Sequence, residues 1–310
     1  MFSSRIEGTQ STLGELLASE AGAAVARSPE DLREVGNYVA ALEHGMARLK
    51  TLPLSIRLVR ELHEKLMTGV RGDHATPGEL RRSQNWIGPP GSTLAQATYV
   101  PPPHDEMLDE LGSWEKFLHD ETLPPLVQTA LIHYQFEAIH PFLDGNGRVG
   151  RLLITLLLMH RGVLPLPLLY LSAFFEATRR DYYDSLRGVT ERSAWEDWLL
   201  YFLNGVARQS EDALSRAERI NQQLDQWRER ANRTGSGVAL RLLDLLAVNP
   251  FITVRKAEVQ LGVAYNTAAL AFRRLVRLRI VNQVGAARRD RVFCAQTLLD
   301  ILEEPPRLHP

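Results

Sequence analysis

The sequence predicts a mainly helical protein with two domains, and three observations support this fold class. The chain of 310 residues is long enough for about two domains of ordinary size. Apolar residues recur at spacings of three and four along most of its length, the pattern of helices with one buried face. Cys294 is the single cysteine, which excludes a disulfide framework and a zinc site built on several thiolates.

Composition and charge indicate a folded protein and exclude several other classes of protein. Hydrophobic residues make up 45% of the chain, charged residues 24%, and the formal net charge is −1, which excludes intrinsic disorder. The charge is unevenly distributed, because residues 238–291 contain ten Arg or Lys against three acidic residues. This segregation suggests two modules with different partners. No apolar run is long enough to span a membrane and no export signal is found, so we expect a cytoplasmic protein.

The first two helices are expected over residues 29–49 and 54–67. Ser28 and Pro29 form a typical helix start, a hydroxyl cap followed by proline at the first helical position. The first helix should bury one face, made of Leu32, Val35, Val39, Leu42, Met46 and Leu49. From about Gly72 to Pro103 glycine and proline interrupt the helical period, and we expect a β-hairpin flap. Such a flap either pairs its edge with an extended peptide or only covers the core.

Five further helices are expected over residues 105–119, 126–139, 148–161, 172–189 and 194–233. The last of them is rich in Trp and Leu at first and polar in its second half, which is typical of a linker helix. Residues 234–237 (Thr-Gly-Ser-Gly) end it. We therefore predict an N-terminal segment (1–28), a helical domain (29–205), a linker helix (206–236) and a C-terminal domain (237–310).

The C-terminal domain has the pattern of a winged helix-turn-helix. Helices are expected over 238–248, 254–261 and 266–279, and residues 288–294 could form the returning strand of a wing. Basic residues lie on or near the second and third helices: Arg255, Lys256, Arg273, Arg274, Arg277 and Arg279. Double-stranded nucleic acid attracts such charge. Winged helices also dock proteins, so DNA is one of two candidate partners.

Residues 140–151, with the sequence HPFLDGNGRVGR, carry the clearest chemical signal. They join one apolar helix to the start of the next, and Gly145 and Gly147 allow the backbone to approach a ligand closely. The first N–H groups of the second helix have no acceptor within the helix, and the positive end of its dipole lies behind them. Phosphate is the usual occupant of such a position.

The side chains of this loop complete the pattern. Arg148 and Arg151 are three residues apart and can reach the same anion. Asp144 supplies a hard oxygen ligand, which suits Mg²⁺ bridging phosphates. His140 has an unperturbed pKa near neutrality and is the candidate general base. Together these residues indicate phosphoryl or nucleotidyl transfer from a nucleotide–Mg²⁺ complex. His133, Glu137 and His160 have suitable chemistry too, but packing or solvent explains them.

The loop resembles the signature of Fic-domain proteins, HxFx(D/E)GNGRxxR, at every specified position. Further blocks that resemble the family occur in order at residues 34–43, 67–72, 82–88 and 99–103, so the resemblance covers about residues 1–205. It implies a Fic helical core with a β-hairpin flap, followed by the linker helix and the winged helix. It also implies transfer of AMP from ATP to a Ser, Thr or Tyr hydroxyl of a protein.

Carried over by this resemblance, His140 takes the proton from the attacking hydroxyl and Asp144 holds Mg²⁺. The phosphates are held by Gly145, Asn146, Gly147, Arg148 and Arg151. Tyr183 lies where the family often has a tyrosine near the adenine, although an aromatic residue in an amphipathic helix is more often part of a core.

Residues 3–8 resemble the inhibitory motif S/T-x-x-x-E-G of autoinhibited Fic proteins, with Ser3 and Glu7 at the specified positions. The resemblance implies that the Glu7 carboxylate pairs with Arg151 and occupies the cation meant for the γ-phosphate. In some family members the same glutamate helps to remove AMP, so a hydrolytic activity stays open.

Other functions and partners also remain open at this point. A DNA-binding regulator whose Fic-like body senses a nucleotide is the alternative, but such a sensor needs no general base like His140. The loop recognises phosphates and says little about the rest of the transferred group, so transfer of UMP or phosphocholine is a further option. Expected partners are a protein target, this chain itself through self-modification, a second copy in a homodimer and DNA, with no membrane.

Overall fold

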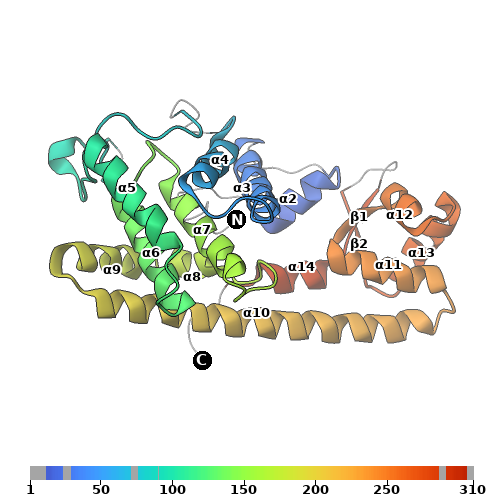
Figure 1. Ribbon diagram of the computed structural model, residues 1–310. Coiled ribbons are helices and arrows are strands. Elements are labelled where there is room, and N and C mark those ends of the chain that lie inside the picture. The colour runs from blue at the N-terminus through green and yellow to red at the C-terminus, as the bar shows by residue number, and fades with distance from the viewer. Residues whose placement is uncertain (1–11, 24–28, 71–75, 90, 286–290, 306–310) are drawn as a thin grey trace. The chain divides into compact units, whose positions relative to one another are not determined.

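The structure is a computed structural model of the chain, and it describes residues 12–23, 29–70, 76–89, 91–285 and 291–305. The chain is mainly helical with one small sheet, as the sequence predicts (Figure 1). The described residues form two compact units, the first made of Pro29–Ser210 and the second of residues 12–23 and 211–305. The described helices include none with both the length and the apolar composition that a bilayer crossing requires.

The first unit contains seven α-helices of the described chain and the first part of an eighth. These are α3 (Pro29–Arg48), α4 (Ile56–Met67), α5 (His104–Leu118), α6 (Pro125–Ile139), α7 (Asn146–His160), α8 (Leu171–Ala177), α9 (Arg179–Arg192) and the start of α10 (Trp195–Asn232). The predicted single helix over 172–189 is wrong, because the backbone leaves the helical conformation at Thr178 (φ −114°, ψ 36°). The Thr178 hydroxyl lies 2.8 Å from the Phe174 carbonyl and 2.7 Å from the Tyr201 hydroxyl, so side-chain bonds hold this break.

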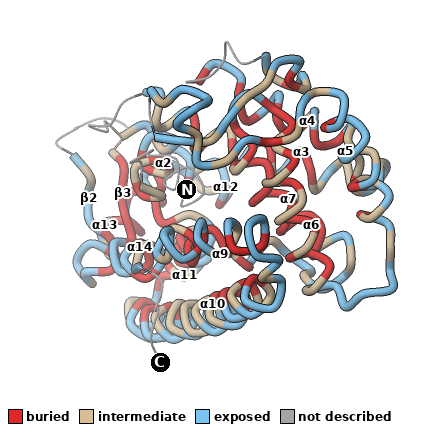
Figure 2. The backbone as a smooth tube through the Cα atoms, turned by 90° about the vertical axis from the view of Figure 1, so that its left-hand side faces the viewer, coloured by how far each residue is buried: buried red, intermediate tan, exposed pale blue. Residues whose placement is uncertain are grey.

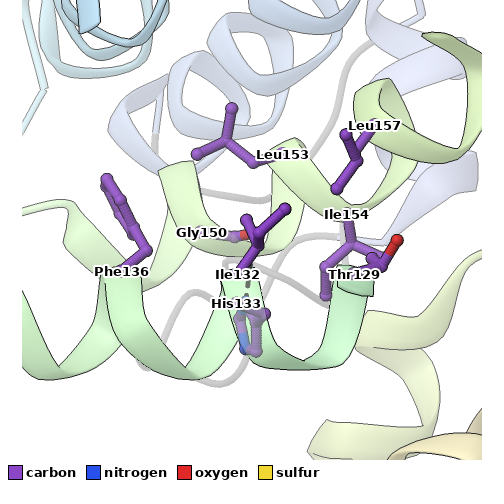
Figure 3. A pocket seen from close by; sticks show the side chains of 8 residues that line it. All are labelled: Thr129, Ile132, His133, Phe136, Gly150, Leu153, Ile154 and Leu157. Carbon is purple, nitrogen blue, oxygen red and sulfur yellow. Dashed lines mark hydrogen bonds between the residues drawn. The ribbon is translucent and has the colours of Figure 1, made fainter. Parts of the chain in front are cut away.

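The buried helix α7 is the centre of this unit. Twelve of its residues are buried, and the tube of Figure 2 is red along most of it. Helix α6 packs along α7, where Gly150 leaves room for the side chain of Glu137, and Figure 3 shows the apolar side chains of the two helices facing each other. Helix α3 meets α7 at Gly45, where an added Cβ would lie 2.6 Å from Leu156. The two glycines therefore let two helices, α3 and α6, approach the helix that carries the loop.

The buried face of α3 agrees with the predicted one at most positions. Val35 is buried, and Leu42, Met46 and Leu49 are partly buried against the core. Val39, which we expected in the core, is 40% exposed. The fully buried residues are Glu34, Val35, Tyr38, Ala41 and Gly45.

The predicted flap is present as a folded loop with very little β structure. A single antiparallel bridge joins Ile87 to Tyr99, with the Ile87 N–H donating to the Tyr99 carbonyl over 2.9 Å. The short 3₁₀ helix η2 (Leu94–Gln96) lies between the two residues. The expectation of a full hairpin is therefore wrong within residues 84–89 and 91–103, because the glycines and prolines leave room for one paired position only.

The second unit contains the end of α10, then α11 (Gly237–Val248), β1 (Phe251–Thr253), α12 (Val254–Leu261), α13 (Tyr265–Arg277), β2 (Asn282–Val284), β3 (Val292–Cys294) and α14 (Gln296–Glu303). The strands form an antiparallel sheet in the order β1-β3-β2. Helices α11, α12 and α13 pack on one another around Leu242, Phe272 and Leu275. Phe272 stacks on Phe293 of β3 with ring centroids 4.4 Å apart, which joins helices and sheet.

The short helix α2 (Leu13–Glu20) also belongs to the second unit, although it lies near the start of the chain. Thr12 and Glu15 form a complete capping box at its first turn. The backbone N–H of Gly14 donates to the Glu303 carboxylate of α14 over 2.8 Å. Ala18 packs with Phe251 and Leu299 in a small apolar cluster. This segment is thus held by residues almost three hundred positions later in the sequence.

Candidate active site

The geometry of the candidate site is set by the turn between α6 and α7. Helix α6 ends at His140, whose backbone adopts the left-handed conformation (φ 50°, ψ 62°). Helix α7 begins after Gly145, which is also left-handed (φ 79°). An added Cβ at Gly145 would lie 2.7 Å from the Met67 sulfur, so both the conformation and the space favour glycine. The N-terminus of α7, with its positive dipole end, is thereby aimed at the loop.

Asn146 braces this loop from within. Its side chain is 1% exposed, and its Oδ1 atom accepts from the Phe142 N–H over 2.9 Å. Its Nδ2 atom donates to the Phe142 carbonyl over 2.8 Å. Both ends of the amide are therefore engaged with one residue of the loop. We predicted Asn146 as a phosphate ligand, and the structure places its side chain on the loop backbone instead.

His140 is held as a neutral base with a defined tautomer. Its Nδ1 atom lies 3.2 Å from the Glu137 carbonyl oxygen. Because a carbonyl oxygen only accepts, Nδ1 carries the proton and the lone pair is on Nε2. Burial lowers the pKa of His140 to about 4, so the ring is neutral at pH 7. A neutral imidazole with an available Nε2 can accept a proton from a hydroxyl group.

Arg148 and Arg151 lie in the first two turns of α7 and are both buried, at 6% and 3% exposure. One Arg148 nitrogen is 3.6 Å from the Asp144 carboxylate. Buried guanidinium groups in a helix that starts at the loop provide a concentrated positive charge close to its N-terminus. The structure brings these residues together with His140 in one turn and one helix, as the sequence predicts for an anion site.

Asp144 fits the role of a single protein ligand for Mg²⁺. Its side chain is 51% exposed, and its Oδ1 atom accepts from the Gly145 N–H over 2.6 Å. No cluster of three or more His, Cys, Asp or Glu side chains suited to a metal occurs within the described residues. One carboxylate is the expected protein share for Mg²⁺ that substrate phosphates and water also coordinate.

Arg81 is a positioning residue that the sequence analysis missed. It is 1% exposed, and its Nε donates to the His140 carbonyl over 2.9 Å. Its other nitrogens donate to the Ser83 and Pro102 carbonyls, at the two ends of the flap, over 3.3 and 2.5 Å. Arg81 thus links the two ends of the flap to the backbone of His140, the candidate general base. Arg81 and Arg82 are adjacent and identical in type, so the sequence does not indicate which of the two is buried.

His63 of α4 is a second missed positioning residue. The Gly78 N–H donates to its Nδ1 over 2.8 Å, so its Nε2 carries the proton and donates to the Asp144 carbonyl over 3.0 Å. Its ring stacks on Phe142 with centroids 3.8 Å apart. Burial lowers its pKa to about 4, and the neutral ring keeps this arrangement at pH 7. A histidine on an apolar helix face gave no hint that it supports a loop eighty residues later.

Tyr183 of α9 borders a cavity of about 660 Å³ beneath the flap. The flap contributes Ile87 and Thr98–Val100 to the cavity wall, and α6 contributes Tyr134 and Glu137. Tyr183 is 39% exposed, and the guanidinium of Arg179 lies 5.9 Å from its ring centroid. The tyrosine therefore lies at a cavity surface and is not part of the apolar core.

The remaining candidates are explained by their positions. His133 is buried between α6 and α7, where its Nδ1 lies 3.2 Å from the Gly150 carbonyl (Figure 3) and its Nε2 2.8 Å from the Tyr182 hydroxyl. It is a packing residue, as expected. His160 is exposed at the far end of α7. The inhibitory motif residues Ser3 and Glu7 lie outside the described residues.

The fold and site define a helical domain in which a glycine-containing turn at a helix N-terminus carries two buried arginines and a neutral imidazole. Residues 53–158 match the model of the Fic/DOC family, and residues 1–47 match the model of the Fic/DOC family N-terminal region. The first match includes the whole loop from His140 to Arg151. The family resemblance drawn from the loop is therefore confirmed over these residues.

Named relatives agree with this match. The protein adenylyltransferase Fic of Drosophila erecta is 32% identical over 166 residues, which cover 52% of this chain and 31% of that protein. The Drosophila melanogaster protein of the same name is 31% identical over 166 residues, covering 52% of this chain and 32% of that protein. The chain thus spans about a third of the length of the curated relatives it matches.

Solved structures show the same fold. A Fic family protein from Desulfovibrio desulfuricans G20 covers 95% of this chain and 84% of its own, with a TM-score of 0.60 and 22% identity. Fic-1 (residues 134–508) from C. elegans covers 70% of this chain and 61% of its own, with a TM-score of 0.56 and 26% identity. The first likeness extends over nearly the whole chain and concerns the fold alone.

Proposed function

We propose that this protein is a protein adenylyltransferase, which transfers AMP from ATP to a Ser, Thr or Tyr hydroxyl of a protein. The hydroxyl oxygen attacks the α-phosphorus, the bond from that phosphorus to the bridging oxygen breaks, and diphosphate leaves. The proton of the hydroxyl passes to Nε2 of His140. The observation that carries this proposal is the fixed tautomer of His140, with its free Nε2 beside the anion-binding N-terminus of α7.

The loop and α7 supply the positive charge that the reaction needs. The backbone N–H groups of Asn146 and Gly147 would hold phosphate oxygens, and Arg148 and Arg151 would neutralise the β- and γ-phosphates. The Gly145 N–H, which donates to the Asp144 carboxylate in this structure, would join them once that carboxylate turns to a metal ion. Asn146 contributes by keeping the loop rigid, since its side chain is bonded to Phe142. Preorganised charge of this kind supplies most of the catalysis in phosphoryl and nucleotidyl transfer.

The Asp144 carboxylate would hold Mg²⁺, which would neutralise negative charge on the phosphates when bound. Tyr183, at the cavity under the flap, would lie near the adenine. The flap would present the target segment to His140. Each of these roles follows the family resemblance.

Glu7 would act as an inhibitory residue, with Ser3 at the start of the same motif. Its carboxylate would pair with Arg151 and prevent productive binding of the γ-phosphate. Removal of AMP by water positioned at the same glutamate is a second activity that the site could perform. Both suggestions concern a segment outside the described residues and rest on the motif.

The experiment is incorporation of label from α-labelled ATP, with Mg²⁺, into proteins of a cell lysate and into the protein itself. We expect Glu7→Gly to increase incorporation many-fold over the unmodified protein. In that background His140→Ala should abolish it, whereas His160→Ala, an exposed histidine of α7, should not. Equal label with α-labelled UTP would point to a different nucleotide, and no label from either would refute the transferase.

A second function is favoured by the C-terminal unit. Its helix–strand–helix–helix–strand–strand order supports a winged helix-turn-helix, and Arg255, Lys256, Arg273 and Arg277 are exposed on α12 and α13. We propose DNA as its candidate ligand, in which case the first unit would act as a nucleotide-sensing body. Binding of a mixed-sequence DNA duplex that is lost in Arg273→Ala/Arg277→Ala would support it. A homodimer stays a proposal without a described interface.

A further inference from the structure

A second cavity lies against the flap and has no role in the proposed reaction. Its volume is about 350 Å³. Helix α5 contributes Glu106, Glu110 and Ser113 to its wall, which are spaced to lie on one face of the helix. The other lining residues are Tyr99, Pro102, Trp114, Tyr134, Gln135, Ala138, Ile139 and Trp195. All of them belong to the first unit.

The wall of this acidic–aromatic cavity carries two carboxylate groups. Glu106 and Glu110 are exposed, and neither pairs with a cation among the residues that the structure describes. The Oε1 atom of Gln135 is buried and accepts no hydrogen bond within the described part of the chain. The lining contains no Lys, Arg or His. A ligand with positive charge and N–H donors would therefore complement the wall.

The aromatic residues favour the same kind of ligand. The rings of Tyr134 and Trp195 meet edge to face, with centroids 4.9 Å apart, and Trp195 is 40% exposed. A partly exposed indole and two carboxylates in the wall of one cavity suit a guanidinium or ammonium group, because the ring quadrupole and the carboxylates both attract cations. The hydrophobic stem of a long basic side chain would lie on the same rings.

The cavity adjoins the one beneath the flap. Tyr99, Tyr134 and Ala138 line both, and Tyr99 is the residue through which the flap forms its bridge. The Tyr99 hydroxyl donates to the Ala138 carbonyl over 2.9 Å, which fixes the wall between the two cavities. An extended peptide lying along the flap would thus place one side chain in the acidic–aromatic cavity and another, which carries the acceptor hydroxyl, on the side of the cavity beneath the flap.

We infer that the acidic–aromatic cavity binds an arginine or lysine side chain of the polypeptide that is modified, and so selects targets with a basic residue near the acceptor hydroxyl. This inference rests on the proposed function for the identity of the polypeptide as a substrate. Binding of the basic side chain itself needs no nucleotide transfer. The two can therefore be tested separately.

The binding test uses fluorescent ten-residue peptides with one threonine, in which a single arginine is moved through an otherwise neutral sequence. Fluorescence anisotropy with the full chain should show one or two positions that bind about tenfold tighter than the arginine-free peptide, the size expected for one cation–π contact with an ion pair. Glu106→Gln/Glu110→Gln should abolish this preference. Asp109→Asn, an exposed carboxylate on α5 outside the cavity wall, should keep it.

Three results would overturn the inference. One is equal binding of all peptides, and another is a preference that survives in Glu106→Gln/Glu110→Gln. The third is N-acetyl-arginine amide binding as tightly as the best peptide, which would identify the occupant as a free small cation. If the binding preference appears but no protein accepts label from ATP, the cavity binds a basic side chain, whereas the proposed transferase and the selection of its targets both fail. If label is transferred without any preference for basic peptides, the transferase holds and the inference fails.

Discussion

Replacing Arg81 by lysine should show whether Arg81 acts through its fork of hydrogen bonds or through its positive charge, because lysine keeps the charge and loses the fork. The guanidinium donates to four carbonyl oxygens, those of Ser83, Pro102, Ile139 and His140. A lysine ammonium keeps the charge but cannot span the same fork, so at least two of these bonds are lost. Hydrogen bonds to a charged group contribute about 1.5–3 kcal/mol each, so the loss of two gives about 3–6 kcal/mol.

The adjacent residue Arg82 provides the control. Its side chain is 86% exposed and lies 4.0 Å from Glu79, a surface pair that contributes little. Differential scanning calorimetry should show the transition of the first unit lowered by about 10 °C in Arg81→Lys, because 1 kcal/mol corresponds to about 2–4 °C at this size. Arg82→Lys should leave it unchanged.

The same pair of variants tests whether Arg81 positions His140 or only stabilises the fold. In the Glu7→Gly background, and well below the transition, we expect Arg81→Lys to lower kcat for AMP transfer while KM for ATP stays nearly constant. The reason is that loss of the Arg81 fork would displace His140, which acts in the chemical step. The arginines that would bind the phosphates lie on α7 and would stay in place. A midpoint within 2 °C of the Arg82→Lys protein would refute the reasoning about the buried fork.

Three further outcomes follow from the site. Gly145→Ala should lose nucleotide binding measured by calorimetry, because a left-handed residue and a Cβ 2.7 Å from the Met67 sulfur distort the loop, whereas Gly162→Ala, also left-handed but in open space, should keep it. Asn146→Ala should lower the free energy of unfolding by about 2–4 kcal/mol, since two buried backbone groups of Phe142 lose their partners; a loss under 1 kcal/mol would contradict this. The native pKa values of His63 and His140 are lowered to about 4, so their contribution to stability is full above pH ~6.5 and is lost as pH falls toward 4; urea unfolding at pH 7 and pH 5 checks this, and equal stability would contradict it.

Local sequence patterns were sufficient where neighbours in the chain decide the structure. The helices at 104–118, 125–139 and 254–261 lie within one or two residues of their predicted bounds, because hydrophobic periodicity is decided over a few positions. The turn between α6 and α7 was predictable for the same reason, since its glycines, acid and arginines occur within twelve residues.

Features that depend on distant residues could not be predicted in this way. The role of His63 depends on Asp144 and Gly78, and that of Arg81 on carbonyl groups at both ends of the flap. The break at Thr178 depends on Tyr201 of another helix. Each requires knowing which segments meet, and hydrophobic periodicity identifies a buried face without identifying its partner.

The placement of α2 has a consequence for the synthesis of this protein. Gly14 leaves the ribosome 289 residues ahead of Glu303, its hydrogen-bond partner, and at 5–20 residues per second the wait is roughly 15–60 s. During that time the apolar side of α2 has none of its native contacts with Phe251 or Leu299. A nascent chain stalled before residue 296 should therefore expose α2 to chaperones and proteases even when the first unit has already folded.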